Sequence, residues 1–259
     1  MEPVRSIARA LDALEVLAAQ DEVGLMELAR RLGLAPSSAH RLLMTLTLRG
    51  WVVQSPDSGR YRLSYRVLGL AARLHPRTAR LRAAVRPYLE RAHKVSGATA
   101  NLVVLQGCDV VYLDQVRAGP EARMFVEAGR SVPAHSAGAG KALMAQLPED
   151  ELRILRSSEP YERFTRRTIT TADELHRELA RVRRRGFAVD DEEHETGVTC
   201  VAAPVFDRTG EAVAAISVSG PAERMRVVGL RELGDFLVIL TGELSSELAI
   251  SPPPAPDRA

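Results

Sequence analysis

A cluster of short polar side chains with one arginine stands out near the amino terminus. The cluster lies on one face of a helix predicted to start at Pro36, and its members are Ser37, Ser38, His40, Arg41 and Thr45. Hydroxyl, imidazole and guanidinium groups hydrogen bond to base edges and phosphates, and no acid interrupts them here. A helix with such a face can enter the major groove of DNA. The alternative is an ordinary pair of leucine-rich helices with a solvated outer face.

Two more arginines lie in the segment that follows this helix. Residues 51–55 and 60–64 are typical of strands, and the residues between them, 56–59, are typical of a turn. Arg60 and Arg62 alternate with apolar residues, so both lie on one face of the second strand. A basic hairpin directly after two short helices is a wing, which we expect to hold the DNA backbone. Together the two parts predict a winged helix-turn-helix domain over residues 1–64.

Three helices must position the polar face. We expect Ser6 to cap the first, an apolar pattern from Leu25 to Leu32 marks the second, and Pro36 starts the third. Residues 30–73 hold eight arginines and one acid, although the net charge of the whole chain is only +2. This local excess of positive charge supports a nucleic-acid surface on the first domain.

The rest of the chain is predicted to form a linker and a second domain. A linker helix over residues 65–76 should end at His75 and Pro76, and a new helix should open the domain over residues 77–250. The residues from Thr99 onward alternate between strand and helix patterns. The expected strands span 101–105, 110–116, 123–128, 198–206 and 212–219, and the expected helices span 138–146, 149–156 and 172–185 before a long closing helix. The fold class is therefore α+β with a mostly antiparallel sheet, and the proline-rich end, 251–259, is expected to be disordered.

Other kinds of chemistry fit the sequence less well. Residues 138–141 (GAGK) are similar to part of a phosphate-binding loop, but His135 replaces its first glycine and Ala142 replaces its magnesium-binding hydroxyl. His135, His194 and Cys200 match no short metal motif, and the apolar run around Cys200 would make its thiol unreactive. We therefore expect no enzyme activity, no cofactor and no bound metal. A metal- or thiol-dependent sensor is kept as an alternative.

The chain carries no signal for export or membrane insertion. No apolar run approaches the roughly 18 residues of a membrane helix, and no long apolar core follows Ser6. The two cysteines, Cys108 and Cys200, have no metal-like spacing and fit a reducing compartment. We expect a cytoplasmic protein without a membrane partner.

Seven short sequence motifs follow one another along most of the chain, in the order that a known family shows. They lie at residues 39–43, 61–63, 68–71, 113–116, 132–143, 197–206 and 216–221. With them, the chain from about Ser6 to Leu248 resembles the IclR-type bacterial transcriptional regulators. The resemblance implies an N-terminal winged helix-turn-helix domain, a C-terminal GAF-like effector domain, and a homodimer or homotetramer on a partly palindromic DNA operator.

The resemblance also implies an effector pocket, since some members bind small keto acids. The positions that match are Gly138, Ala139, Asp190, Cys200, Ser217 and Ser219, with Met124 as an apolar wall. The residue types support the match at two places. Small residues at a helix start expose backbone N–H groups that can hold a carboxylate, and serines two apart on a strand share one face. The plainer interpretations are a core thiol, tolerated strand serines and a solvated acidic turn.

The expected function is a DNA-binding regulator whose effector is a small carboxylate or keto acid. The same family framework also holds aromatic acids. The alternative from another class is a small-molecule sensor that acts without specific DNA binding.

Overall fold

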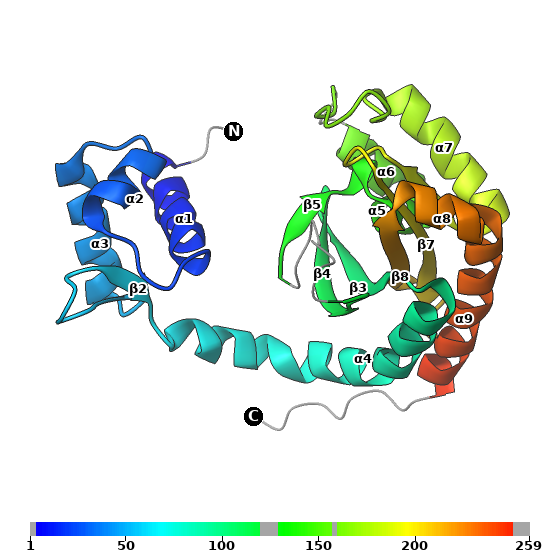
Figure 1. The fold of residues 1–259 in the computed structure, drawn as a ribbon, viewed down its shortest axis with the longest axis horizontal. Coiled ribbons are helices and arrows are strands. Elements are labelled where there is room, and N and C mark those ends of the chain that lie inside the picture. Colours follow the sequence, from blue (N-terminus) through cyan, green and yellow to red (C-terminus); the bar gives the residue numbers. More distant parts are fainter. Residues whose placement is uncertain (1–3, 120–128, 157–159, 251–259) are drawn as a thin grey trace. The chain divides into compact units, whose positions relative to one another are not determined.

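The computed structural model describes residues 4–119, 129–156 and 160–250. By its internal contacts the chain divides into two compact units, residues 1–77 and 78–259. Figure 1 shows the elements of each unit.

The first unit is a three-helix head with a small hairpin. Its elements are α1 (Arg5–Ala18), α2 (Leu25–Arg31), α3 (Pro36–Leu48), β1 (Val52–Gln54) and β2 (Tyr61–Leu63). The two strands pair antiparallel, and residues from all three helices pack against the hairpin in one apolar core. The predicted winged helix-turn-helix is confirmed.

The first helix differs in detail from the prediction. α1 begins at Arg5 with Val4 as its N-cap residue, so Ser6 lies in the first turn and does not cap the helix. Ile7 and Leu11, two apolar residues of α1, are 58% and 55% exposed, whereas Leu17 is buried. The apolar residues of α1 allow more than one rotation about its axis, and the shape of the core formed by the other two helices selects one of them.

A single helix, α4 (Arg66–Ser96), replaces the two helices that were predicted on either side of Pro76. The prediction rested on the steric restriction that proline places on the residue before it, which disfavours the helical conformation at that residue. In a helix of 31 residues that local cost affects one turn among many. The predicted end at His75 was therefore wrong. The later part of α4 packs on the second unit through Val85, Leu89 and Ala92.

The second unit is built on an antiparallel sheet. Among the described residues it contains six strands in the order β5-β4-β3-β8-β7-β6, each antiparallel to its neighbours. The strands are β3 (Thr99–Gln106), β4 (Asp109–Val116), β5 (Ser131–Pro133), β6 (Ala188–Asp191), β7 (Val198–Phe206) and β8 (Ala212–Pro221). The predicted α+β class is confirmed. β5 and β6 were not predicted, and the expected strand over 123–128 and the tail over 251–259 lie outside the described residues.

Helices cover both faces of this sheet. A short 3-10 turn, η1, precedes the helices of one face: η1 (Ala134–Ser136), α5 (Gly138–Met144), α6 (Glu149–Arg156) and α7 (Ala172–Arg185). The other face is covered by the later part of α4 together with α8 (Ala222–Val228) and α9 (Leu230–Ile250). The candidate effector residues lie on the face that α5 covers. Among the helices that the structure describes, none is long and apolar enough to cross a membrane.

Candidate functional site

The polar face of α3 is exposed, as a DNA-reading helix requires. Its inward side chains, Ala39, Leu43 and Leu46, are buried in the head. The five predicted contact residues all lie on the exposed side, and they are Ser37, Ser38, His40, Arg41 and Thr45. The Thr45 hydroxyl donates to the carbonyl of Arg41 at 2.8 Å, so its oxygen is still able to accept a hydrogen bond. The structure places these side chains together and in solvent; base contact stays a prediction.

The two wing arginines differ in their surroundings. The Arg60 guanidinium donates to the carbonyl of Glu22 at 3.0 Å and lies 3.4 Å from the Glu27 carboxylate. These contacts join the wing to α2 and compete with a phosphate for the same group. Arg62 is half-buried, and its guanidinium lies 5.9 Å from the centre of the Tyr65 ring. Its hydrogen-bonding edges are better placed for a phosphate than those of Arg60.

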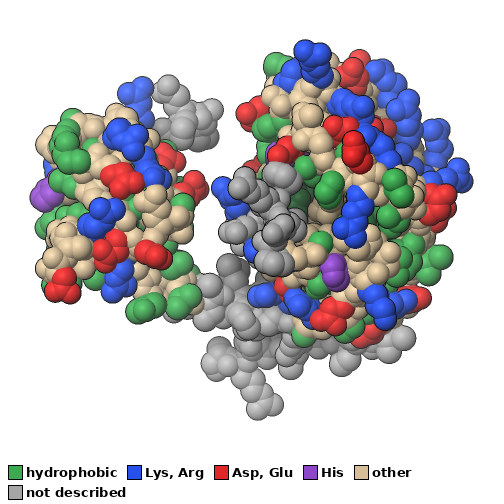
Figure 2. Space-filling view, in the orientation of Figure 1, with side chains coloured by type: hydrophobic (Ala, Val, Ile, Leu, Met, Phe, Trp, Pro, Cys, Tyr) green, Lys and Arg blue, Asp and Glu red, His purple; other side chains and the backbone are tan. Residues whose placement is uncertain are grey.

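Positive charge alone does not single out the head as the DNA surface. Basic side chains also gather along the edge of the second unit where α7 runs (Figure 2). The last turn of α7 holds Arg183, Arg184 and Arg185, and Arg185 pairs with Glu178 at 2.8 Å. The assignment of the DNA surface therefore depends on the α3 face and its fold and not on charge.

Six of the predicted effector positions meet on the α5 face of the sheet. Strand register places Asp190 on β6 opposite Cys200 on β7, and Cys200 opposite Ser219 on β8. Ser217 lies two residues before Ser219 on the same face, and α5 begins at Gly138 directly above these strands. A methyl group on Gly138 would meet the Cys200 sulfur at 3.2 Å. The first turn of α5 thus packs on the strands because residue 138 has no side chain. Met124 lies outside the described residues.

Cys200 is a buried thiol. Hydrogen bonding with the Ser217 side chain and the Ala139 backbone lowers the pKa of this thiol. Burial nevertheless raises the pKa of Cys200 to about 12, and the nearby carboxyl of Asp190 adds to this increase. A thiol with this pKa is protonated and a poor nucleophile. Cys200 therefore offers a weak donor and a polarizable surface to a ligand, which argues against thiol catalysis.

Asp190 is buried, contrary to the interpretation of its acidic segment as a solvated turn. It lies in β6, is 5% exposed, and its Oδ1 accepts the backbone N–H of Glu193 at 2.7 Å and of His194 at 3.4 Å. Burial raises the pKa of Asp190 to about 7, against the lowering effect of the Lys141 charge and of these two N–H groups. The carboxyl can thus change its protonation state near neutral pH.

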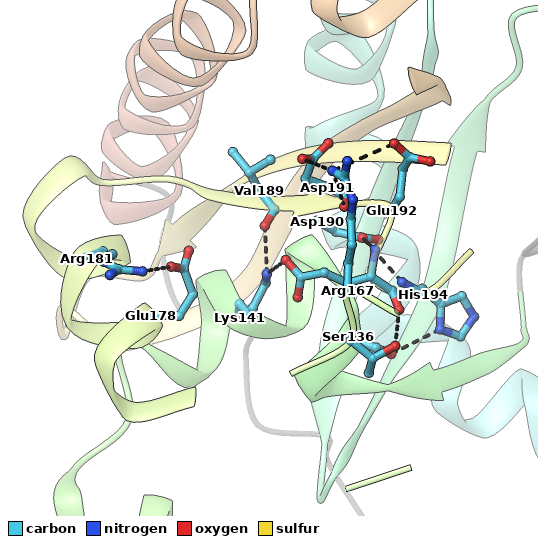
Figure 3. Close-up of polar contacts among 12 residues, drawn as sticks. Ser136, Lys141, Arg167, Glu178, Arg181, Val189, Asp190, Asp191, Glu192 and His194 are labelled. Atoms are coloured by element: carbon cyan, nitrogen blue, oxygen red, sulfur yellow. Dashed lines mark hydrogen bonds and ion pairs between the residues drawn. The ribbon is translucent and has the colours of Figure 1, made fainter. Parts of the chain in front are cut away.

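A buried ion pair lies beside this site, between α5 and the segment that carries Asp190. Lys141 is fully buried, and its ammonium is paired with the carboxylate of Glu193, a residue distant in the sequence. Its ammonium donates to the Glu193 carboxylate and, at 2.7 Å, to the carbonyl of Val189 (Figure 3). Burial raises the pKa of Glu193, while the charge of Lys141 lowers it. The pair ties α5 to the segment that carries Asp190.

Asp191 and Glu192, which follow Asp190, form ion pairs with side chains from other parts of the domain (Figure 3). Arg226 of α8 pairs with Asp191 at 2.7 Å and with Glu192 at 2.5 Å, and Arg167 also pairs with Asp191. Glu192 has a φ of +63°, a conformation that is strained for a residue with a side chain. The segment from Asp190 onward is thus held in one shape by contacts with α5, α8 and Arg167.

Two residues of the polar cluster were not predicted from the sequence. Asn101 of β3 is fully buried opposite Ser217, and its Nδ2 donates to Ser217 and Ser219, each at 3.2 Å. Tyr112 of β4 is 8% exposed, and the charges of Cys200 and Asp190 add to the effect of burial in raising its pKa. The signal for Asn101 was an amide directly before the apolar residues 102–105 of its strand, since an amide must find partners when buried.

The histidines that were considered as metal ligands have other partners. His135 is stacked on Tyr161 and contacts the carbonyl of Glu162 at 3.0 Å, and His194 contacts the hydroxyl of Ser136 at 3.0 Å. Burial lowers the pKa of both histidines. Over the described ranges, no group of three His, Cys, Asp or Glu side chains is placed to hold a metal ion. A cavity of about 210 Å³ lies beside His135, and none of the predicted effector residues is among those that line it.

Comparison with known proteins agrees with this arrangement. Residues 76–241 match the family model of the bacterial transcriptional regulator IclR C-terminal domain. Residues 6–56 match the family model of the IclR helix-turn-helix domain. The HTH-type transcriptional regulator BhcR of Paracoccus denitrificans is 38% identical over 247 residues, which cover 95% of this chain and 88% of that protein. The transcriptional repressor IclR of Escherichia coli is 35% identical over 245 residues, which cover 93% of this chain and 89% of that protein.

A solved structure shows the same fold. The crystal structure of Thermotoga maritima IclR covers 95% of this chain and 99% of its own, with a TM-score of 0.71 and 29% sequence identity. The exposed α3 face lies within the matched helix-turn-helix domain, and the six clustered positions lie within the matched C-terminal domain. The chain is therefore a DNA-binding transcriptional regulator with an effector-binding domain and not an enzyme, and it belongs to the IclR family of bacterial transcriptional regulators.

Proposed function

We propose that this regulator binds a partly palindromic operator as a homodimer or homotetramer in the cytoplasm and responds to a small carboxylate or keto acid. The observation that carries the DNA part is the exposed polar face of α3, which is free of acids and backed by the buried Ala39, Leu43 and Leu46. A face of this kind reads base edges, while wing arginines hold phosphates and fix its register. Two copies of the head on one operator explain why a palindrome is expected.

The DNA part is tested with an Arg41→Ala variant in a mobility-shift or anisotropy assay on operator and random duplexes. A guanidinium that contacts a base typically contributes about 1–3 kcal/mol of discrimination, so operator affinity should fall about tenfold or more. Arg62→Ala should weaken binding to both duplexes and reduce the salt slope by about one. Arg9→Ala, an exposed arginine on α1, is the matched control. Unchanged operator affinity in Arg41→Ala would remove α3 from the interface and favour a sensor without specific DNA binding.

The effector part rests on the polar cluster of the α5 face. Ser217 and Ser219 supply hydroxyls, Asp190 supplies a carboxyl with a pKa of about 7, and glycine at position 138 leaves the first turn of α5 close to them. These groups are small, polar and sheltered from water, which suits a compact acid more than a large apolar one. An aromatic acid would need apolar walls beyond the six clustered positions.

The effector part is tested by thermal shift with short keto and hydroxy acids beside simple aromatic acids. A saturable rise in melting temperature that is lost in the Ser217→Ala/Ser219→Ala variant would support the proposed site and class. Ser246→Ala is the matched control, because its hydroxyl donates to the Gly242 carbonyl on α9, away from the cluster. A shift with aromatic acids alone would replace the proposed class, and a shift that survives in the double variant would remove the proposed site.

A further inference from the structure

A buried amide in the effector cluster has one polar atom without a partner. Asn101 is fully buried, and its Nδ2 donates to the hydroxyls of Ser217 and Ser219 at 3.2 Å each. Its Oδ1 is also buried and has no hydrogen-bond partner among the described residues. Buried amide oxygens are nearly always paired, since an unmade hydrogen bond costs more than a made one contributes. An orphan acceptor in the middle of a polar cluster therefore needs an explanation.

The hydrogen bonds of the cluster fix which way the amide points. The Ser217 oxygen accepts from Asn101, which turns Nδ2 toward β8 and Oδ1 away from it. The second bond, to Ser219, holds the same orientation. The amide is thus positioned by the serines and presents an acceptor and no donor.

The remaining groups define what would satisfy that acceptor. Ser219 is half-buried and its oxygen accepts from Asn101, so its proton is available to a ligand. An acid whose carboxylate is bound by donors still needs a donor of its own to pair with Oδ1. A hydroxyl next to the carboxylate provides one, whereas a carbonyl or a methyl group at the same place does not.

We infer that Asn101 is an effector-binding residue that selects acids bearing a hydroxyl at carbon 2, either 2-hydroxy acids or the hydrated form of 2-oxo acids. The Oδ1 atom accepts the hydrogen bond of that hydroxyl, and the two serines hold the amide for it. In the structure this oxygen is buried without a partner among the described residues, and the hydroxyl of a bound acid would pair with it. This inference rests on the proposed effector class and refines it.

The test compares two pairs of probes that differ by one hydroxyl: glycolate with acetate, and lactate with propionate. Binding to the full chain is measured by calorimetry. We expect each hydroxy acid to bind about tenfold or more tightly than its deoxy partner, because a site built to bond a hydroxyl leaves polar groups unpaired with the analogue that lacks it. Asn101→Leu should remove this ratio by weakening the hydroxy acid alone. Gln106→Leu, an exposed position on the same strand, should keep it.

Each outcome separates the two proposals. Equal affinity within both pairs, or a ratio that survives in Asn101→Leu, would overturn the role of Asn101 and leave the small-carboxylate proposal standing. No binding by any of the four acids would overturn both. If Asn101→Leu does not fold, as judged by circular dichroism, the comparison within the unaltered protein still decides, since equal affinities there contradict a selective acceptor.

Discussion

Replacing Lys141 by methionine should reveal how much the buried Lys141–Glu193 pair beside the proposed effector site contributes to stability. The side chain of Lys141 is completely buried, and that of its partner Glu193 is 11% exposed. Methionine retains most of the packing of the lysine stem but removes the ammonium. The Glu193 carboxylate then lies buried with its main counter-charge removed, and the Val189 carbonyl loses a donor. Removing one partner of a buried pair costs about 3–5 kcal/mol, a large part of the stability of a typical domain.

The cost should depend on pH in a defined direction. Burial already raises the pKa of Glu193, and removing the lowering influence of Lys141 raises it further. An acid whose pKa is higher in the folded than in the unfolded state stabilises the fold when protonated, so the variant loses stability as pH rises through that folded pKa. The difference between Lys141→Met and the unaltered protein should therefore be largest in alkaline solution and shrink on acidification.

Urea unfolding at several pH values measures this difference. Lys94→Met is the matched control, because Lys94 is exposed on α4 and its replacement should change stability by no more than about 0.5 kcal/mol. Adding Glu193→Leu to Lys141→Met should recover most of the loss, since the stranded carboxylate is then absent. A loss below about 1 kcal/mol in the single variant, or no recovery in the double one, would refute the pairing as described.

Two further predictions concern neighbouring positions of the same unit. Asp190→Asn keeps the acceptor for the two backbone N–H groups and removes the charge. Because the pKa of Asp190 is about 7 in the folded protein and 3.8 ordinarily, the free energy of unfolding of the unaltered protein should fall by about 4 kcal/mol between about pH 4 and about pH 7. Urea unfolding near both ends of that range should show this loss in the unaltered protein and not in the variant. Gly140→Ala should unfold the effector domain at a lower temperature, because the new methyl group would overlap the backbone of Ala134, whereas Gly242→Ala on α9 meets nothing within 4 Å and should leave the melting temperature unchanged or raise it. Equal melting temperatures for the two glycine variants would contradict the close approach of α5 to η1.

Elements with strong local signals were predictable from the sequence. The bounds of α7 match the prediction, because Thr171 caps its first turn by accepting the Glu174 N–H at 3.3 Å and Gly186 ends it at a φ of +83°. The bounds of β7 also match, since a largely apolar run that is buried on both faces has few alternatives. In both cases the residues that fix the structure lie within the element itself.

Elements that depend on distant partners were not predictable. β6 contains Asp190 and Asp191, residues that disfavour strands, and it forms because register with β7 and burial against α5 outweigh that preference. The continuity of α4 through Pro76 and the burial of Lys141 likewise arise from packing that no local pattern reports. Lys141 in particular lies in a helix that the core encloses on every side, so its partner Glu193 had to come from far along the chain.

The same distinction separates the two functional surfaces. The proposed DNA face consists of positions on a single short helix, so residue types and helical spacing were enough to predict that its side chains share one exposed side, and DNA contact stays a prediction. The effector cluster combines residues of α5, β3, β6, β7 and β8, whose side chains meet only because of the strand order β3-β8-β7-β6. Family resemblance supplied six of those positions without explaining them. Asn101 shows what the geometry adds, because only the hydrogen bonds to Ser217 and Ser219 identify its oxygen as the unsatisfied group, and thereby the kind of ligand that would satisfy it.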